Sequence, residues 1–112
     1  MVHEMKLQPN YFEYIKNGTK RIELRLNDEK RRQIKLGDTI KFLKEPKLLE
    51  SFNTKVIGLL RYENFESLFQ DFDVSILSDV SMTKEELLNV LQEFYTLEHQ
   101  QKYGVLGIRI EL

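Results

Sequence analysis

The segment Gly18–Arg25 reads Gly-Thr-Lys-Arg-Ile-Glu-Leu-Arg, and the expected fold is built around it. A glycine such as Gly18 is typical of the left-handed position that follows a helix. From Thr19 to Leu26 apolar and charged residues alternate, as in a strand with one buried face. The core face carries Ile22, Leu24 and Leu26, and the other face carries Arg21, Glu23 and Arg25. The segment therefore predicts a helix end followed by a strand that begins beside a lysine, Lys20.

The rest of the chain supplies strand and helix patterns on both sides of this segment. Pro9 suits the first turn of a helix, and Thr83 with Glu86 forms a capping box that begins another. Further strands are expected at residues 2–7, 39–43, 54–62 and 105–112, and helices at 9–17, 64–72 and 83–95. The segment 27–35 is expected to be a loop or one helical turn, and residues 46–53 a loop. The pattern predicts one α+β domain over residues 1–112, with a small, mainly antiparallel sheet that closes into a barrel flanked by helices.

Composition excludes several classes of protein. The 112 residues are 41% hydrophobic and contain no cysteine, so disorder, disulfides and thiolate chemistry are not expected. No apolar run is long enough to cross a membrane, and the first residues lack the pattern of a signal peptide. His3 and His99 do not have the spacing of a metal pair. We expect a cytoplasmic protein with neither metal nor cofactor.

Charge is unevenly distributed along the chain. Residues 1–50 hold 12 Lys and Arg against 8 Asp and Glu, whereas residues 51–112 hold 5 against 10. Such asymmetry is typical of a nucleic-acid-binding face. Two oppositely charged halves that attract each other in the folded protein would give the same pattern.

Lys20 is the main candidate for ligand binding. It is in phase with Ile22 and Leu24, which places it on the core side at the first residue of the strand. An ammonium in a partly dry cleft at the rim is suited to a phosphate or a developing anion. The alternative is a lysine that extends along the barrel to solvent.

Two interpretations remain for Glu23. On an exposed face it holds Arg21 and Arg25 in place, since residues two apart on one strand can pair. If the strand is bulged, Glu23 joins Lys20 in the cleft and acts as an acid or base.

Further candidates are a basic segment and nearby aromatic residues. Lys30, Arg31 and Arg32 are consecutive and suit phosphate contacts, although a solvated charged loop is the commoner outcome. Tyr14 lies at the edge of the first helix, where it could stack on a base.

The sequence resembles an ASCH domain. The resemblance is carried by Gly18, Lys20, Glu23 and Arg25, by the later Gly37-Asp38 pair, and by the closing run Tyr103–Arg109. It covers nearly the whole chain and implies a PUA-like pseudo-barrel that binds RNA or other nucleic acid at Lys20, in a cleft between barrel and helices.

Some ASCH proteins are acylcytidine amidohydrolases and others are ribonucleases. The amidohydrolases pair the lysine with a threonine on the same strand and a carboxylate from the distal helical region. This chain has Glu23 in place of the threonine, and Val80 near the position of the carboxylate, with Asp79 adjacent.

Three functional hypotheses follow. In the first, the protein binds RNA or a modified nucleotide or nucleoside through Tyr14, Gly18, Lys20, Arg21, Arg25 and the basic segment 30–32. In the second, it is an amidohydrolase or ribonuclease in which Lys20 and Glu23 are catalytic. In the third, the acidic second half binds a protein, which an exposed apolar patch beside the helix at 83–95 would favour.

Overall fold

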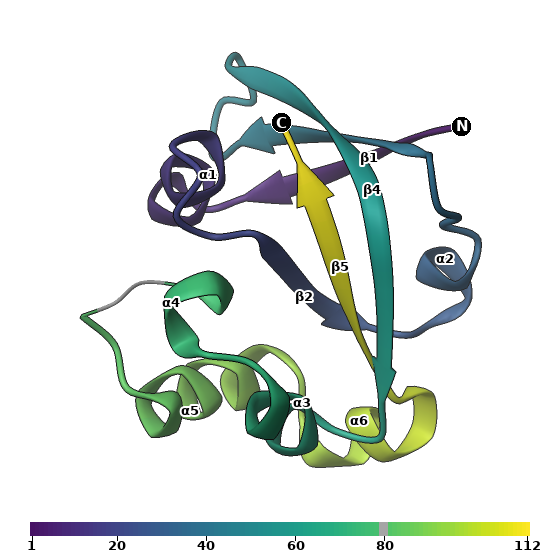
Figure 1. Cartoon of the computed structure of the whole chain (residues 1–112), viewed down its shortest axis with the longest axis vertical. Helices are drawn as coiled ribbons and strands as arrows, with labels where there is room; N and C mark the ends of the chain where they lie inside the picture. Colours follow the sequence, from purple (N-terminus) through teal and green to yellow (C-terminus); the bar gives the residue numbers. More distant parts are fainter. Residues whose placement is uncertain (79–80) are drawn as a thin grey trace.

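A five-stranded sheet forms the centre of the molecule in a computed structural model that describes residues 1–78 and 81–112. The strand order is β1-β3-β4-β5-β2; β1 and β3 are parallel, and all other neighbours are antiparallel. The sheet curls into a half-barrel (Figure 1). The predicted α+β, mainly antiparallel architecture is confirmed.

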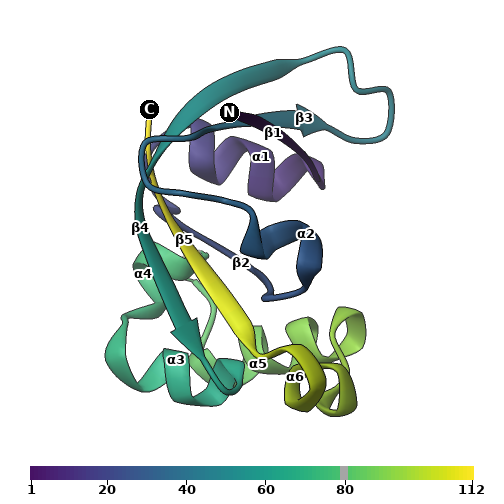
Figure 2. The same ribbon diagram turned by 90° about the vertical axis from the view of Figure 1, so that its right-hand side faces the viewer.

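The strands are β1 (Val2–Leu7), β2 (Ile22–Leu26), β3 (Thr39–Lys44), β4 (Ser51–Tyr62) and β5 (Val105–Glu111). The helices of the described residues are α1 (Pro9–Lys16), α2 (Glu29–Arg32), α3 (Phe65–Asp71), α4 (Val74–Leu77), α5 (Lys84–Phe94) and α6 (Leu97–Tyr103). None of these helices has the length and apolar character needed to span a bilayer. Helix α1 lies toward one end of the curled sheet, and α3 to α6 gather at the other (Figure 2).

Local sequence signals account for most of these boundaries. Gly18 takes a φ of 85° just after α1, a conformation that glycine adopts without steric cost. The Thr83 hydroxyl accepts a hydrogen bond from the backbone N–H of Glu86, and the Glu86 carboxylate accepts one from the N–H of Thr83, so the predicted capping box is formed. The register between β4 and β5 shifts between Val56 and Gly58, as the glycine in β4 indicated.

The apolar interior consists of two clusters on either side of the curl. One joins α1 to β1, β3 and β4, and includes Phe12 and Phe42. The other joins β2 to α3, α4 and α5, and includes Ile22, Leu77 and Leu87. Strand β5 contributes to both, and the candidate site lies where the clusters meet.

The structure differs from the sequence-based expectations at several element boundaries. The strand expected from Thr19 starts only at Ile22, because the backbone N–H of Lys20 bonds the Tyr14 carbonyl (2.9 Å) and that of Arg21 bonds the Ile76 carbonyl (2.8 Å). Strand β4 already begins at Ser51, within the expected loop.

Two short helices were not predicted. Helix α4 lies in a segment without a clear pattern, and α6 precedes the expected turn at Gly104. Two apolar side chains in the expected strand 105–112 and the expected helix 83–95 are exposed: Leu112 (64%), which follows the last residue of β5, and Phe94 (57%), at the last turn of α5.

Candidate functional site

A cavity of about 220 Å³ lies between the edge strands β1 and β2, which have no strand neighbour between them. Its walls come from the start of α1, the end of α4 and one face of α5. These segments are far apart in sequence and meet only because the sheet curls. We refer to this cavity as the cleft.

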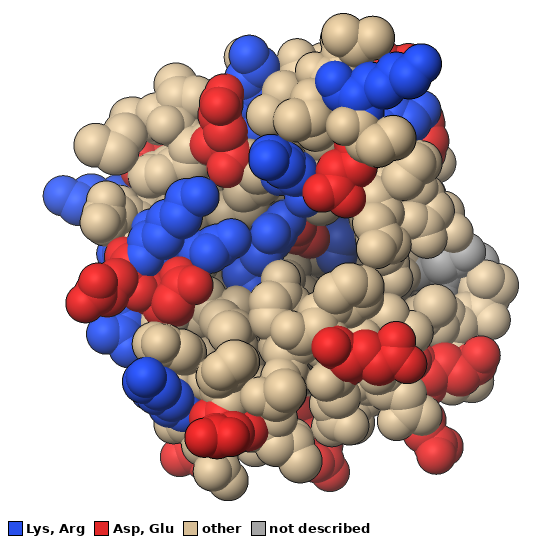
Figure 3. Space-filling view, turned by 180° about the vertical axis from the view of Figure 1, so that it is seen from behind, with Lys and Arg blue, Asp and Glu red and all other residues tan. Residues whose placement is uncertain are grey.

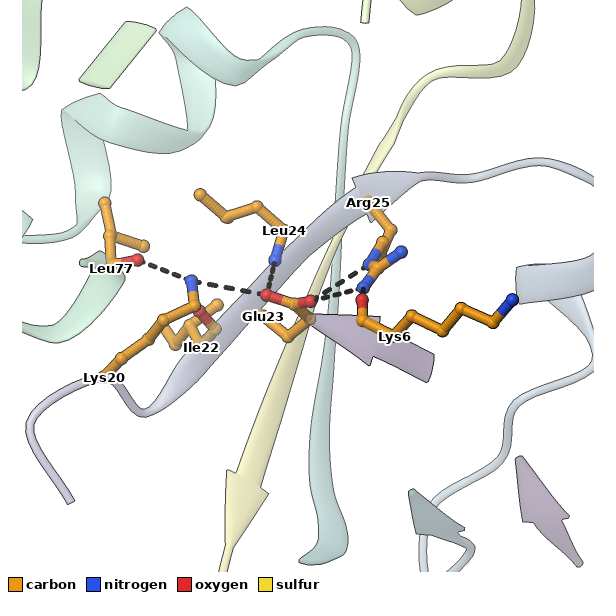
Figure 4. A network of polar contacts seen from close by, with 7 residues as sticks. All are labelled: Lys6, Lys20, Ile22, Glu23, Leu24, Arg25 and Leu77. Atoms are coloured by element: carbon orange, nitrogen blue, oxygen red, sulfur yellow. Dashed lines mark hydrogen bonds and ion pairs between the residues drawn. The ribbon is translucent and has the colours of Figure 1, made fainter. Parts of the chain in front are cut away.

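The floor of the cleft is a row of three charged residues, the buried Lys20 and Glu23 and the partly buried Arg25 (Figure 4). The Glu23 carboxylate lies 3.4 Å from Lys20 Nζ and accepts hydrogen bonds from Arg25 Nε (3.0 Å) and Nη2 (2.8 Å). Lys20 Nζ also donates to the carbonyls of Ile22 (2.7 Å) and Leu77 (2.6 Å). With all three groups ionised, the row carries one net positive charge.

Burial and ion pairing act in opposite directions on these groups. Burial lowers the pKa of Lys20, and the charge of Glu23 only partly offsets this effect. Burial also opposes ionisation of Glu23, but the charges of Arg25 and Lys20 together hold the pKa of its carboxyl below the ordinary value. The pKa of Arg25 is raised despite burial, by Glu23 and by the neighbouring Tyr95. The shifts keep Glu23 and Arg25 ionised at neutral pH, whereas burial works against the charged form of Lys20.

The walls of the cleft differ in character. One wall is apolar and comes from α5, through Leu87, Val90, Leu91 and Phe94. The other includes Tyr11 of α1 and the exposed Lys6 at the end of β1. Figure 3 shows a hollow on this face with basic side chains gathered beside it and uncharged surface below it. Such a cleft offers positive charge on one side and apolar and aromatic contact on the other.

Two phenol groups border the charged row. Burial and the charge of Glu23 raise the pKa of Tyr11. Burial raises the pKa of Tyr95, which follows the last residue of α5, while the charge of Arg25 opposes the shift. Both side chains are therefore neutral hydroxyls at neutral pH, able to donate a hydrogen bond to a ligand.

Three of the predicted site residues meet in the cleft: Lys20, Glu23 and Arg25. Glu23 is 4% exposed, so its face of β2 is not the solvated face that one interpretation assumed. Glu23 meets Lys20 without a bulge in β2. Lys20 precedes the strand, so its side chain does not have to follow the alternation of side-chain directions within β2.

Three other predicted residues lie outside the cleft. Gly18 and Arg21 line a second, more apolar hollow beside Ile57 and Leu112, and Lys20 lies between this hollow and the cleft. The Arg21 side chain is exposed and does not join Glu23 and Arg25 as the alternation predicted. Tyr14 is half-buried and packs edge-to-face on Tyr11, with ring centroids 6.1 Å apart, which makes it a neighbour of the cleft wall.

The basic segment forms α2, near but not in the cleft. Arg31 pairs with Asp28 at 3.1 Å, and its charge also influences Tyr95 at the cleft wall. The guanidinium Nε of Arg32 donates to the Asn27 carbonyl, and Lys30 is exposed. These residues add positive charge near the mouth of the cleft, but they do not form part of its floor.

Sequence reasoning missed the α5 wall and Lys6. The capping box predicted α5 itself, but it did not indicate that Phe94 borders a cleft. An aromatic residue at the last turn of an amphipathic helix was the one available signal, and it does not indicate which strand the helix lies against.

Two further expectations concern a distal carboxylate and a metal site. Asp79 and Val80, considered as positions for a distal carboxylate, lie outside the described residues. Within residues 1–78 and 81–112, no group of three or more His, Asp or Glu side chains is arranged to hold a metal ion.

The sequence matches the family model of the ASCH domain over residues 5–112. No curated protein matches it significantly. Among solved structures, it is similar to hypothetical protein PH0355, with 40% identity and a TM-score of 0.87 over 99% of this chain and 98% of that one. Protein PF0455 from Pyrococcus furiosus is 37% identical, with a TM-score of 0.79 over 99% and 96% of the two chains. A mutant of ZmASCH from Zymomonas mobilis shares only 9% identity, but with a TM-score of 0.71 over 99% of this chain and 68% of that one it has the same fold.

Proposed function

The chain belongs to the ASCH domain family, and from this membership and the chemistry of the cleft we propose that it binds RNA or a modified nucleotide or nucleoside. The observation that carries the proposal is the charged floor beside an apolar wall. A ligand with an anionic or carbonyl group and a flat apolar ring satisfies both sides at once. Nucleotides have this combination.

The size of the cleft favours one nucleotide over a long stretch of strand. Its volume of about 220 Å³ is below the roughly 300–1,000 Å³ of pockets that enclose drug-sized ligands. We propose that one nucleotide enters, with its unstacked base against Phe94 and Tyr11 and its own phosphate at the charged floor. Neighbouring phosphates would then lie near Lys6 and the basic α2.

A binding titration tests this proposal. The probe is a fluorescently labelled single-stranded hexanucleotide RNA, titrated at 50 and 200 mM KCl, with the same sequence in duplex form as the comparison. Affinity is expected to fall steeply with salt, because phosphate contacts release counterions, and the single strand should bind more tightly than the duplex. The absence of binding at 50 mM KCl, to both the hexamer and free nucleoside monophosphates, would refute the proposal.

A second candidate function is hydrolysis of an acylated nucleoside or of RNA. Burial lowers the pKa of Lys20, and a lysine with a lowered pKa is suited to proton abstraction. Glu23 is less suited to act as a base, since its lowered pKa makes the carboxylate a weak proton acceptor. An assay with acetylcytidine and with RNA distinguishes the two functions: binding without turnover is expected, and turnover that is lost in Lys20→Met would establish the enzyme instead.

A cytoplasmic location remains part of this proposal.

The third hypothesis, a protein-binding surface beside α5, has less support. Phe94 and Leu97 are both 57% exposed, but Phe94 lines the cleft and is assigned there to the ligand.

A further inference from the structure

We propose that Arg25 is the cation of the cleft floor that contacts the ligand, and that Lys20 is a positioning residue that holds the floor together. This inference rests on the proposed function, nucleotide or RNA binding in the cleft. It departs from the sequence-based expectation that the lysine itself meets the ligand. The two side chains differ in how many of their N–H groups already have hydrogen-bond partners.

The ammonium of Lys20 has three N–H donors and three acceptors around it. Two are the carbonyls of Ile22 and Leu77, at 2.7 and 2.6 Å, and the third is Glu23 Oε1, at 3.4 Å. The side chain is only 4% exposed. A ligand could gain a bond from Lys20 only by displacing one of these buried acceptors, which would leave a backbone carbonyl or a carboxylate less satisfied.

The contacts of Lys20 join parts of the chain that are far apart. Its bond to Leu77 ties the start of β2 to the end of α4, 57 residues away in sequence. Its contact with Glu23 helps to fix the carboxylate that in turn holds Arg25 through two hydrogen bonds. Lys20 therefore acts on the ligand through Glu23 and Arg25.

Arg25 is less fully engaged and more accessible. Three of its five N–H groups donate to Glu23 and to the Lys6 carbonyl (3.1 Å). The Tyr95 hydroxyl is a further hydrogen-bond partner of the guanidinium, which leaves at least one N–H of Nη1 without a partner among the described residues. The side chain is 14% exposed, compared with 4% for Lys20. Arg25 can therefore donate to a ligand without breaking its existing bonds.

The contacts that Glu23 already makes limit which chemical groups of a ligand can bind at the floor. The Glu23 carboxylate accepts hydrogen bonds from the backbone N–H of Leu24 and from Nε and Nη2 of Arg25, and it also faces Lys20. Both of its oxygens therefore already have partners. The floor thus offers donors and no free carboxylate oxygen. It is suited to a phosphate or a carbonyl oxygen; Glu45, the other carboxylate that lines the cleft, is not part of this row.

The salt dependence of RNA binding distinguishes a residue that contacts the RNA from one that only positions its neighbours. The probe is the labelled hexanucleotide RNA, titrated from 50 to 300 mM KCl against wild-type protein and four variants: Lys20→Met, Arg25→Met, Arg25→Lys and Lys84→Met. Loss of one phosphate contact to a single strand reduces the slope of log affinity against log salt by about 0.7. We expect this reduction for Arg25→Met, a wild-type slope for Arg25→Lys, and no change for Lys84→Met, in which the replaced lysine is exposed at the start of α5.

For Lys20→Met we expect the wild-type slope together with a lower melting temperature. A slope reduced by about 0.7 in Lys20→Met, with Arg25→Met unchanged, would overturn the inference and leave the proposed function intact. If the wild type binds no RNA, the proposed function fails, and with it the ligand role of Arg25.

A second measurement covers the case in which Lys20→Met does not fold. Acetic anhydride is applied to the wild-type protein with and without the hexanucleotide, and modified lysines are identified by mass spectrometry. We expect Lys20 to stay unmodified in both samples while Lys84 reacts in both. A Lys20 that reacts in the free protein and is protected by RNA would show direct contact and refute its positioning role.

Discussion

Replacement of Glu23 by glutamine tests the charged floor most severely. The change keeps the shape of the side chain but removes the negative charge that lies between Lys20 and Arg25. The new amide has an N–H₂ group, which must point toward one of these cations or toward the Leu24 N–H, where the carboxylate accepted hydrogen bonds. Two buried cations then remain in the row without a counter-charge.

The expected loss of stability is large for a protein of this size. Breaking a buried ion pair by removing one partner costs about 3–5 kcal/mol. Domains of this kind have a total free energy of unfolding of only about 5–15 kcal/mol. At about 4 °C per kcal/mol, the midpoint of thermal unfolding should fall by roughly 12–20 °C.

Circular dichroism during heating and in urea measures this change, and Glu13→Gln is the matched control. Glu13 pairs with Lys44 at 3.1 Å, but its side chain is 49% exposed, so its loss should cost less than about 1 kcal/mol. The double variant Lys20→Met/Glu23→Gln should recover part of the stability, because only Arg25 is then unpaired. If Glu23→Gln melts within about 3 °C of the wild type, the row does not depend on its carboxylate and the reasoning is wrong.

Three further predictions concern other parts of the chain. Thr83→Ala removes the hydroxyl that caps α5 and should cost about 1 kcal/mol in urea unfolding; an unchanged urea midpoint would show that the cap contributes nothing. Asp38, whose pKa is lowered to about 2 by hydrogen bonds from His3 and the Lys35 N–H, should stabilise the fold above pH 4 and lose this effect as the pH falls toward 2. The stability difference between wild type and Asp38→Asn should therefore shrink over that range, and a constant difference would count against the assignment. Phe94→Ser should weaken RNA binding several-fold through lost stacking, with little change in melting temperature because the ring is 57% exposed. Unchanged binding together with a clearly lower melting temperature would instead show that Phe94 is a core residue.

Local patterns predicted the parts of the fold that depend on local chemistry. Alternation placed β2, Pro9 marked the start of α1, and the capping box of Thr83 marked the start of α5. These signals act within a few residues, so they hold whatever surrounds them. The same pattern failed for Lys20, because hydrogen bonds to Tyr14 and Ile76 keep residues 20–21 out of the strand.

The site was predicted only on its β2 side. Lys20, Glu23 and Arg25 are close in sequence, so one strand pattern could indicate all three. The opposite wall comes from Leu91 and Phe94, about 70 residues later, and only the curl of the sheet brings them near β2. A periodic pattern gives the apolar face of α5 but not its neighbour, and it could not show that Phe94 remains exposed at the mouth of the cleft.

The location of the bound nucleotide is the most direct test of the account. Amide chemical shifts of ¹⁵N-labelled wild-type protein are followed by NMR during titration with the hexanucleotide RNA. The account predicts perturbations that cluster at the cleft, at Leu7, Tyr11, Leu24, Leu91 and Tyr95. Shifts confined to the open hollow at the far end of β4, around Tyr62, Lys102 and Gly104, would place the ligand elsewhere and contradict it.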